Sequence, residues 1–130
     1  MIGIGVDIGG TFVKVFVMNE YGEIFRQEKM ETDYSKGSQF FLQQLADYIN
    51  RIQQEFAGQK VAVAVGAPGD VDNKNGILRY NPNLKFKDVA DWPMARILKD
   101  LTGILPAVAN DATLAAWGVY EKELNRKGNN

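Results

Sequence analysis

Apolar and polar positions alternate along the first thirty residues of the chain, which is the period of a β-strand. Residues 2–8 place isoleucine or valine at every even position and glycine or aspartate at every odd one. Residues 12–18 follow a glycine pair and are rich in β-branched and aromatic types, and a turn at residues 19–22 leads into residues 23–30. The pattern predicts three consecutive strands joined by tight turns.

The apolar period then changes to that of a helix. From Ser38 onward, apolar side chains recur every three or four residues, and Gly58 is placed to end the helix. Residues 61–65 are apolar at every position, which favours a parallel strand buried on both faces. A long helix and a buried parallel strand are therefore predicted after the first three strands.

The rest of the chain predicts a loop and three further elements. Residues 70–88 are polar and rich in turn-forming types, so we expect a loop with a small hairpin. A second helix is expected to have Asp91 as its N-cap and Pro93 in its first turn. Residues 106–109 form a predicted short strand, and residues 110–127 a third helix. The resulting order, βββαβαβα, resembles the ribonuclease H-like lobes of actin-like ATPases, an α/β fold with a mixed sheet and helices on both faces.

Composition narrows the classes of function. The chain has 130 residues, which fits one domain, and its 45% apolar and 24% charged residues are ordinary for a globular protein. Fifteen basic and sixteen acidic residues give a formal charge of −1 without a run of lysine or arginine, so no nucleic-acid partner is expected. The absence of cysteine and histidine excludes thiolate chemistry, histidine bases and the usual zinc sites within these residues. With neither a basic leader nor an apolar run of about 18 residues, we expect a cytoplasmic protein without a membrane partner.

The segment Asp7-Ile-Gly-Gly-Thr-Phe-Val-Lys14 lies at the turn between the first two predicted strands. Gly9 and Gly10 supply backbone N–H donors without an intruding side chain, as a phosphate group requires. Thr11 adds a hydroxyl donor, Asp7 is placed to hold Mg²⁺ through water, and Lys14 can offset phosphate charge. A glycine hairpin with an incidental aspartate and lysine explains the same residues, and local spacing does not separate the two interpretations.

The same segment resembles the first phosphate motif, Asp-x-Gly-Gly-Thr-x-x-Lys, of the ROK (repressor, open reading frame, kinase) sugar kinases. The resemblance continues at Gly66-Ala-Pro-Gly69, at Gly76 followed by Asn81-Pro-Asn-Leu84, and at Asn110-Asp-Ala112, in the order of the family and at about its spacing. It implies a cytoplasmic kinase of carbohydrate metabolism and glycolysis that uses ATP and Mg²⁺ to phosphorylate a hexose. Glucose is favoured because it is a common substrate among bacterial members with these motifs.

Asn110 and Asp111 lie where the last predicted strand meets the last predicted helix. From the residues alone, either side chain can cap that helix by accepting its free N–H groups. The resemblance implies instead that Asp111 is the catalytic base, which takes the proton of the sugar hydroxyl that attacks the γ-phosphoryl group. It also implies that Asn110 binds the sugar.

Further sugar-binding candidates follow the buried strand at residues 61–65. Beyond the carboxyl end of such a strand, open sheets place their ligands, and by resemblance Gly66, Pro68 and Gly69 line the sugar pocket. A rigid Pro-Gly turn is the alternative. Asn83 offers an amide that both donates and accepts, which suits a sugar hydroxyl, although asparagine also forms turns. Finally, Tyr80, Phe86 and Trp92 can stack on a sugar, whereas aromatic residues in such loops more often pack into the core.

The resemblance further implies that residues 1–130 are only the amino-terminal lobe of a kinase. A second lobe would supply another phosphate loop, the adenosine pocket, a structural zinc site and more sugar-binding residues, so we expect this chain to be inactive alone and its parent protein to be a homodimer. A transcriptional repressor and a non-catalytic sugar sensor are the rival interpretations. Polyphosphate as donor, and mannose, fructose, N-acetylglucosamine or N-acetylmannosamine as acceptor, stay open.

Overall fold

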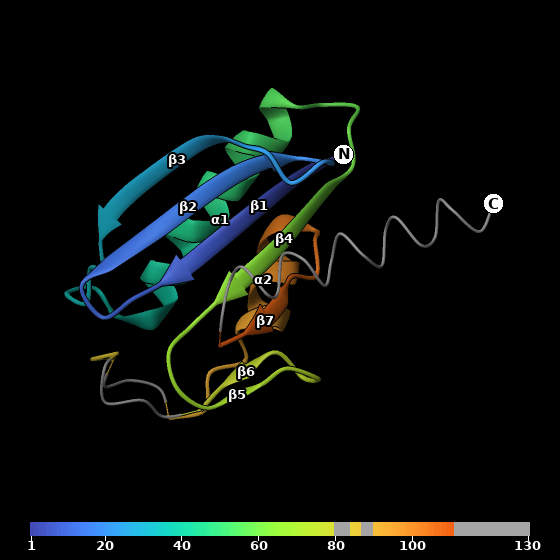
Figure 1. The fold of residues 1–130 in the computed structure, drawn as a ribbon. Coiled ribbons are helices and arrows are strands. Elements are labelled where there is room, and N and C mark those ends of the chain that lie inside the picture. The colour runs from blue at the N-terminus through green and yellow to red at the C-terminus, as the bar shows by residue number, and fades with distance from the viewer. Residues whose placement is uncertain (80–83, 87–89, 111–130) are drawn as a thin grey trace.

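A computed structural model describes residues 1–79, 84–86 and 90–110 of the chain (Figure 1). The elements, in order, are β1 (Ile2–Ile8), β2 (Phe12–Asn19), β3 (Ile24–Glu31), α1 (Gly37–Glu55), β4 (Val61–Gly66), β5 (Val71–Asp72), β6 (Ile77–Leu78), α2 (Met94–Thr102) and β7 (Ala107–Ala109). These match the predicted strands and the first two predicted helices, and β5 and β6 form the expected small hairpin. The third predicted helix lies outside the described residues, apart from Asn110.

The large sheet is mixed and has the strand order β3-β2-β1-β4-β7. β2 runs antiparallel to β1 and to β3, whereas β4 runs parallel to β1 and to β7. In this register Asp7 lies beside Gly66, and Gly66 lies beside Ala109. The carboxyl ends of the three parallel strands therefore lie at one edge of the sheet (Figure 1).

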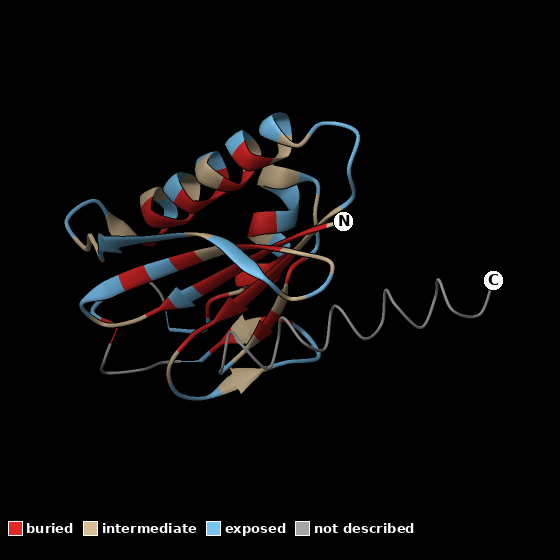
Figure 2. Cartoon of the chain, turned by 45° about the horizontal axis from the view of Figure 1, so that its top comes forward, coloured by how far each residue is buried: buried red, intermediate tan, exposed pale blue. Residues whose placement is uncertain are grey.

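One face of the sheet packs against both helices. The alternating isoleucines and valines of β1 continue across the sheet, since Ile4 pairs with Val17 of β2 and with Val63 of β4. Leu42 and Ile49 of α1 belong to the same buried cluster, as does Leu98 of α2. In Figure 2 the buried stripe of the long helix faces the sheet and its exposed stripe faces away. This apolar layer is the main core of the domain.

Both described helices thus cover the same face of the sheet (Figure 1). The prediction of helices on both faces depends on the helix expected at residues 110–127, which is not among the described residues. Within the ranges that the structure describes, no helix is long and apolar enough to cross a membrane.

The opposite face of the sheet carries a second, smaller apolar cluster. Met18 and Ala64 are buried there, and Phe16, Ala107 and Ala109 pack against them. At the centre of β4, the three consecutive residues Val63, Ala64 and Val65 are at most 3% exposed. The prediction that this strand is buried on both faces is therefore confirmed for its middle.

The start of α2 differs from the prediction. Trp92 and Leu78 exchange two backbone hydrogen bonds, of 2.8 and 2.9 Å, which hold Trp92 in a strand-like bridge with β6. The helix consequently begins at Met94 and has Pro93 as its N-cap, with no side-chain capping bond. The prediction that Asp91 caps this helix is wrong, because a long-range bridge fixes the residue that follows it.

β3 is the outermost strand and is exposed over most of its length. Its middle is tied to the end of α1 by Arg26, whose two terminal nitrogens donate to the carboxylate oxygens of Glu55 at 2.7 and 2.5 Å. These hydrogen bonds lower the pKa of Glu55 below its ordinary value. Exposed charges of both signs, Glu28, Lys29 and Glu31, share the strand with the exposed apolar residues Ile24, Phe25 and Met30.

Candidate active site

Three parallel strands end side by side at the carboxyl edge of the sheet. β1 is followed by the glycine turn, β4 is followed by the loop at residues 67–69, and β7 ends at Ala109, just before Asn110. The N–H of Ala67 donates to the carbonyl of Ala109 at 2.9 Å, which joins the loop after β4 to the end of β7. The sequence motifs at the ends of these strands are therefore neighbours in space.

The glycine turn between β1 and β2 is tight. The N–H of Gly9 donates to the carbonyl of Phe12 at 2.8 Å. A Cβ atom on Gly9 would lie only 2.8 Å from that carbonyl oxygen, so a side chain does not fit at this position. In the part of the chain that the structure describes, the N–H groups of Gly10 and Thr11 donate no hydrogen bond. The turn thus presents two adjacent free donors, an arrangement suited to an anion.

Charged side chains flank the turn on the face opposite the helices. Asp7 of β1 and Lys14 of β2 are register partners, and both are exposed. Lys14 in turn pairs with Lys29 of β3, whose ammonium lies 4.0 Å from the centroid of the Phe12 ring. The five residues predicted to bind the nucleotide and its metal, Asp7, Gly9, Gly10, Thr11 and Lys14, therefore do lie together around one turn.

The carboxylate of Asp7 also fits a magnesium ion of the kind found with phosphates. Mg²⁺ keeps several of its waters and is commonly held by one or two carboxylates together with phosphate oxygens. The described residues include no cluster of three or more histidine, cysteine, aspartate or glutamate side chains that would hold a metal alone. A single carboxylate such as that of Asp7 fits a magnesium ion that phosphate oxygens also bind.

The predicted sugar-binding residues are partly placed by the structure. Gly66 is buried at the end of β4, Pro68 is half-buried, and Gly69 is exposed with a φ of 89°, which favours glycine. Asn110 is exposed at the end of β7. These four residues share the edge that carries Asp7. The other two predicted residues, Asn83 and Asp111, lie outside the described residues.

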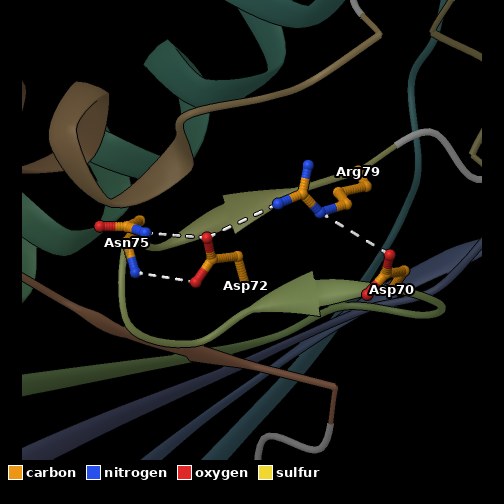
Figure 3. Close-up of polar contacts among 4 residues, drawn as sticks. All are labelled: Asp70, Asp72, Asn75 and Arg79. Carbon is orange, nitrogen blue, oxygen red and sulfur yellow. Dashed lines mark hydrogen bonds and ion pairs between the residues drawn. The ribbon is translucent and has the colours of Figure 1, made fainter.

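A polar network fixes the hairpin that precedes Asn83 (Figure 3). The backbone and side-chain nitrogens of Asn75 donate to the carboxylate of Asp72 at 3.2 and 2.9 Å, and Arg79 lies 3.7 Å from both Asp70 and Asp72. The side-chain bond from Asn75 is the main cause of a lowered pKa for Asp72, and the backbone of Asn75 and the charge of Arg79 add to it. The chain thus enters residues 80–83 from an ordered hairpin.

The aromatic candidates have a structural role where they are described. Phe86 is 6% exposed and Trp92 is 3% exposed, and their ring centroids lie 5.1 Å apart. Phe41 of α1 contacts both rings, and Tyr34 contacts Phe86. Phe86 and Trp92 therefore pack into the core and do not form an exposed stacking surface. Tyr80 lies outside the described residues.

Sequence reasoning missed two residues that contact the glycine turn. The hydroxyl of Thr32 donates to the carbonyl of Gly9 at 2.8 Å, and that of Tyr34 donates to the carbonyl of Gly10 at 2.6 Å. The signal that could have found them is the antiparallel pairing of the second and third predicted strands, which brings the residues after the third strand beside the turn.

A cavity of about 490 Å³ lies elsewhere, towards the amino ends of β4 and β7. It is lined by residues 60–63, by the β5–β6 turn at residues 73–76, by Ala95 and by residues 104–107. None of the predicted site residues that the structure describes lines it. The candidate active site is accordingly the open carboxyl edge and not this cavity.

The mixed sheet, with antiparallel β2 and β3 on one side of β1 and parallel β4 and β7 on the other, is that of an actin-like ATPase lobe. The profile of the ROK family matches residues 3–129, and the chain belongs to this family. It is 32% identical over 116 residues to a glucokinase of Thermotoga maritima, covering 88% of this chain and 35% of that protein.

Two further relatives extend the comparison. An N-acetylmannosamine kinase of Escherichia coli is 27% identical, with 92% of this chain and 39% of that protein covered. The crystal structure of a ROK family glucokinase from Streptomyces griseus, in complex with glucose and AMPPNP, superposes with a TM-score of 0.71 at 30% identity, covering 92% of this chain and 36% of that one. The chain thus spans little more than a third of the length of these relatives.

Proposed function

We propose that this chain is the amino-terminal lobe of a cytoplasmic, ATP-dependent hexose kinase that converts glucose to glucose 6-phosphate. The observation that carries the proposal is the strand register, in which Asp7 lies beside Gly66 and Gly66 beside Ala109. A turn suited to a phosphate and a loop suited to a sugar thereby meet at one edge. Relatives named as glucokinases, one of them solved with glucose and AMPPNP, support the choice of both substrates.

In the proposed mechanism the glycine turn holds the phosphates of ATP. The free N–H groups of Gly10 and Thr11 would donate to phosphate oxygens, Lys14 would offset their charge, and Asp7 would hold Mg²⁺ through water. A bound magnesium ion supplies charge neutralisation for phosphoryl transfer. The exposed positions of Asp7, Thr11 and Lys14 leave all three side chains free to contact a ligand.

The acceptor sugar would lie over the loops that follow β4 and β7. Gly66, Pro68, Gly69, Asn83 and Asn110 would bind its hydroxyls, and Asp111 would take the proton of the attacking hydroxyl. The sugar oxygen then forms a bond to the γ-phosphorus while the bond to the bridging oxygen of ADP breaks, and ADP leaves with that electron pair. Most of the catalysis is positioning and charge neutralisation.

We further propose that a second lobe, encoded beyond residue 130 of the complete protein, completes the kinase. It would carry the other phosphate loop, the adenosine pocket and a structural zinc site, and the complete protein would be a homodimer. The chain of 130 residues is then expected to show no measurable kinase activity by itself.

A turnover assay of the complete protein with a panel of hexoses and N-acetylhexosamines tests the proposal. We expect phosphorylation with glucose preferred and ATP, not polyphosphate, as donor. Asp111→Asn should lower kcat by about 10²–10⁴-fold, the usual contribution of a general base, and leave sugar binding largely intact. Asp100→Asn, an exposed substitution on α2, is the matched control and should retain activity.

Two outcomes would count against the proposal. Wild-type turnover by Asp111→Asn would remove that residue from the role of base. Binding of sugars without phosphorylation of any of them would support a sugar sensor or a repressor instead of a kinase.

A further inference from the structure

We propose that Thr32 and Tyr34, in the segment between β3 and α1, are positioning residues for the phosphate turn. They bind backbone carbonyls of the turn and thereby aim its N–H groups at the ligand. The inference rests on the proposed function for the identity of that ligand, a chain of phosphates. Neither side chain is proposed to touch the phosphates itself.

Three successive carbonyls of the turn are bound from the same segment. The hydroxyl of Thr32 donates to the carbonyl of Gly9 at 2.8 Å, and the hydroxyl of Tyr34 donates to that of Gly10 at 2.6 Å. The backbone N–H of Thr32 donates to the carbonyl of Thr11 at 2.9 Å. Each peptide plane of the turn is therefore held by one hydrogen bond.

The direction of the free donors follows from peptide geometry. A trans peptide is planar, and its C=O and N–H point in opposite directions. Since the structure has no cis peptide bond within the described residues, binding the carbonyl of Gly9 turns the N–H of Gly10 away from Thr32. Binding the carbonyl of Gly10 likewise turns the N–H of Thr11 away from Tyr34. These are the two N–H groups that form no hydrogen bond with other described residues.

The turn needs such anchors because of its composition. Glycine populates positive and negative φ about equally, so a Gly-Gly peptide can rotate and present its carbonyl where an anion would bind. Electrostatic stabilisation is effective when the donors are already oriented before the ligand arrives. Hydrogen bonds to the carbonyls supply that orientation.

Tyr34 is itself fixed by the core. Its ring lies 4.7 Å from that of Phe86, centroid to centroid, and Phe86 packs on Phe41 of α1 and on Trp92. The aromatic cluster thus connects the buried core of the domain to the carbonyl of Gly10. A purely structural role, in which these bonds only attach the hairpin to α1, would predict effects on stability but none on anion affinity.

The test is a titration of the ¹⁵N-labelled chain with inorganic triphosphate and Mg²⁺, followed at the amide signals of Gly10 and Thr11. Thr32→Val and Tyr34→Phe each remove one hydroxyl, and each should weaken triphosphate binding about threefold to tenfold, as expected for one lost hydrogen bond. Thr32→Ser, which keeps the hydroxyl, should bind as the wild type does. Tyr21→Phe removes a hydroxyl from a tyrosine that is 78% exposed and is the matched control.

The same substitutions are then measured in the complete kinase, where we expect them to raise KM for ATP and leave KM for the sugar unchanged. Unaltered amide signals along β4 show that a variant has kept its fold. The two hydroxyls bind different carbonyls, so the positioning role can be tested with either variant if the other does not fold. Equal triphosphate affinity and equal KM for ATP in wild type and variants would overturn the positioning role while leaving the proposed function intact. The claim that the turn binds phosphates would be wrong if two results came together. In the wild-type chain, triphosphate would leave the amide signals of Gly10 and Thr11 unchanged, and the wild-type kinase would not use ATP.

Discussion

The amide of Ala67 donates a hydrogen bond to the carbonyl of Ala109 at 2.9 Å. This bond joins the loop after β4 to the residue that precedes Asn110, and the adjacent register places Gly66 beside Asp7. The motifs at the start, middle and end of the described chain therefore converge at one edge of one sheet. The glycine turn, the loop after β4 and Asn110 therefore share one edge of the sheet.

The first prediction concerns the tightness of the glycine turn. Gly9→Ala should lower the free energy of unfolding by about 1–3 kcal/mol, because its new Cβ would overlap the carbonyl oxygen of Phe12. Urea denaturation measures the loss. Thr11→Ala changes an exposed side chain in the same turn and should stay within about 0.5 kcal/mol of the wild type. Equal stability of Gly9→Ala and Thr11→Ala would contradict the observed geometry.

A second prediction concerns the contact between the β5–β6 hairpin and α2. Gly76 has a φ of +67°, and a Cβ on it would lie 2.1 Å from the Cβ of Ala95. Gly76→Ala should therefore destabilise the domain by about 2–4 kcal/mol, from overpacking together with the left-handed backbone. Ala95→Gly alone should cost about 1 kcal/mol, the usual penalty for glycine in a helix.

The double variant tests whether the two residues share one space. Gly76→Ala combined with Ala95→Gly should be more stable than the sum of the single effects by about 0.5–3 kcal/mol, as for residues in contact. Ala46→Gly removes a buried methyl group from α1 and is the control, whose effect should add to that of Gly76→Ala. If the effect of Gly76→Ala adds to that of Ala95→Gly just as it adds to that of Ala46→Gly, the contact between residues 76 and 95 is refuted.

A third prediction concerns the carboxylate of Asp72. The hydrogen bonds from Asn75 hold its pKa below the ordinary value, with a smaller contribution from Arg79. Asn75→Ala should therefore raise the pKa of Asp72 towards that of a free aspartate, and Arg79→Gln should raise it less. Carboxyl ¹³C signals followed through an acid titration measure both shifts. An unchanged titration midpoint in Asn75→Ala would show that the network does not persist in solution.

The fourth prediction is a pH dependence of stability. The pKa of Glu55 is lowered in the folded state by the two bonds from Arg26, so the unfolded chain binds this proton more readily. The stabilisation is present above the ordinary pKa of glutamate and is lost as the pH falls through the lowered value. Glu55→Gln should reduce stability at pH 7 and flatten its decrease in acid, as measured by urea denaturation.

Glu23→Gln is the control for that experiment, because Glu23 is exposed and has the same formal charge. It should leave the acid limb of the stability curve unchanged. If the free energy of unfolding of Glu55→Gln falls in acid as steeply as that of the wild type, Arg26 and Glu55 do not interact in the folded state.

Much of the fold could be predicted because burial on one face imposes a regular pattern. Ile4 and Val6 must face the core while Gly5 faces away, so the period of two is visible without coordinates. The predicted bounds of the main strands and of α1 agree with the observed ones within about two residues, as is usual for such patterns. The start of α2 could not be predicted, because it depends on a bridge between Leu78 and Trp92, fourteen residues apart.

The candidate site was predictable only where its chemistry is local. Gly9 can be recognised from the sequence because a side chain does not fit at its position in the turn. Thr32 and Tyr34 act on backbone carbonyls more than twenty residues away, and nothing in their own neighbourhood indicates this. Phe86 was ambiguous for the same reason, since only tertiary packing decides whether an aromatic ring in a loop is buried.

The exposed outer strand also bears on how the chain behaves at high concentration. A free strand edge can template the addition of another chain, and charged side chains along that edge oppose such growth. Arg26, Glu28, Lys29 and Glu31 give β3 charges of both signs, and the other edge of the sheet is β7, which has only three residues. β3 also exposes Ile24, Phe25 and Met30, but its charged residues interrupt them. In the part of the chain that the structure describes, neither outer strand is a long apolar template, so polymerisation through sheet extension is disfavoured.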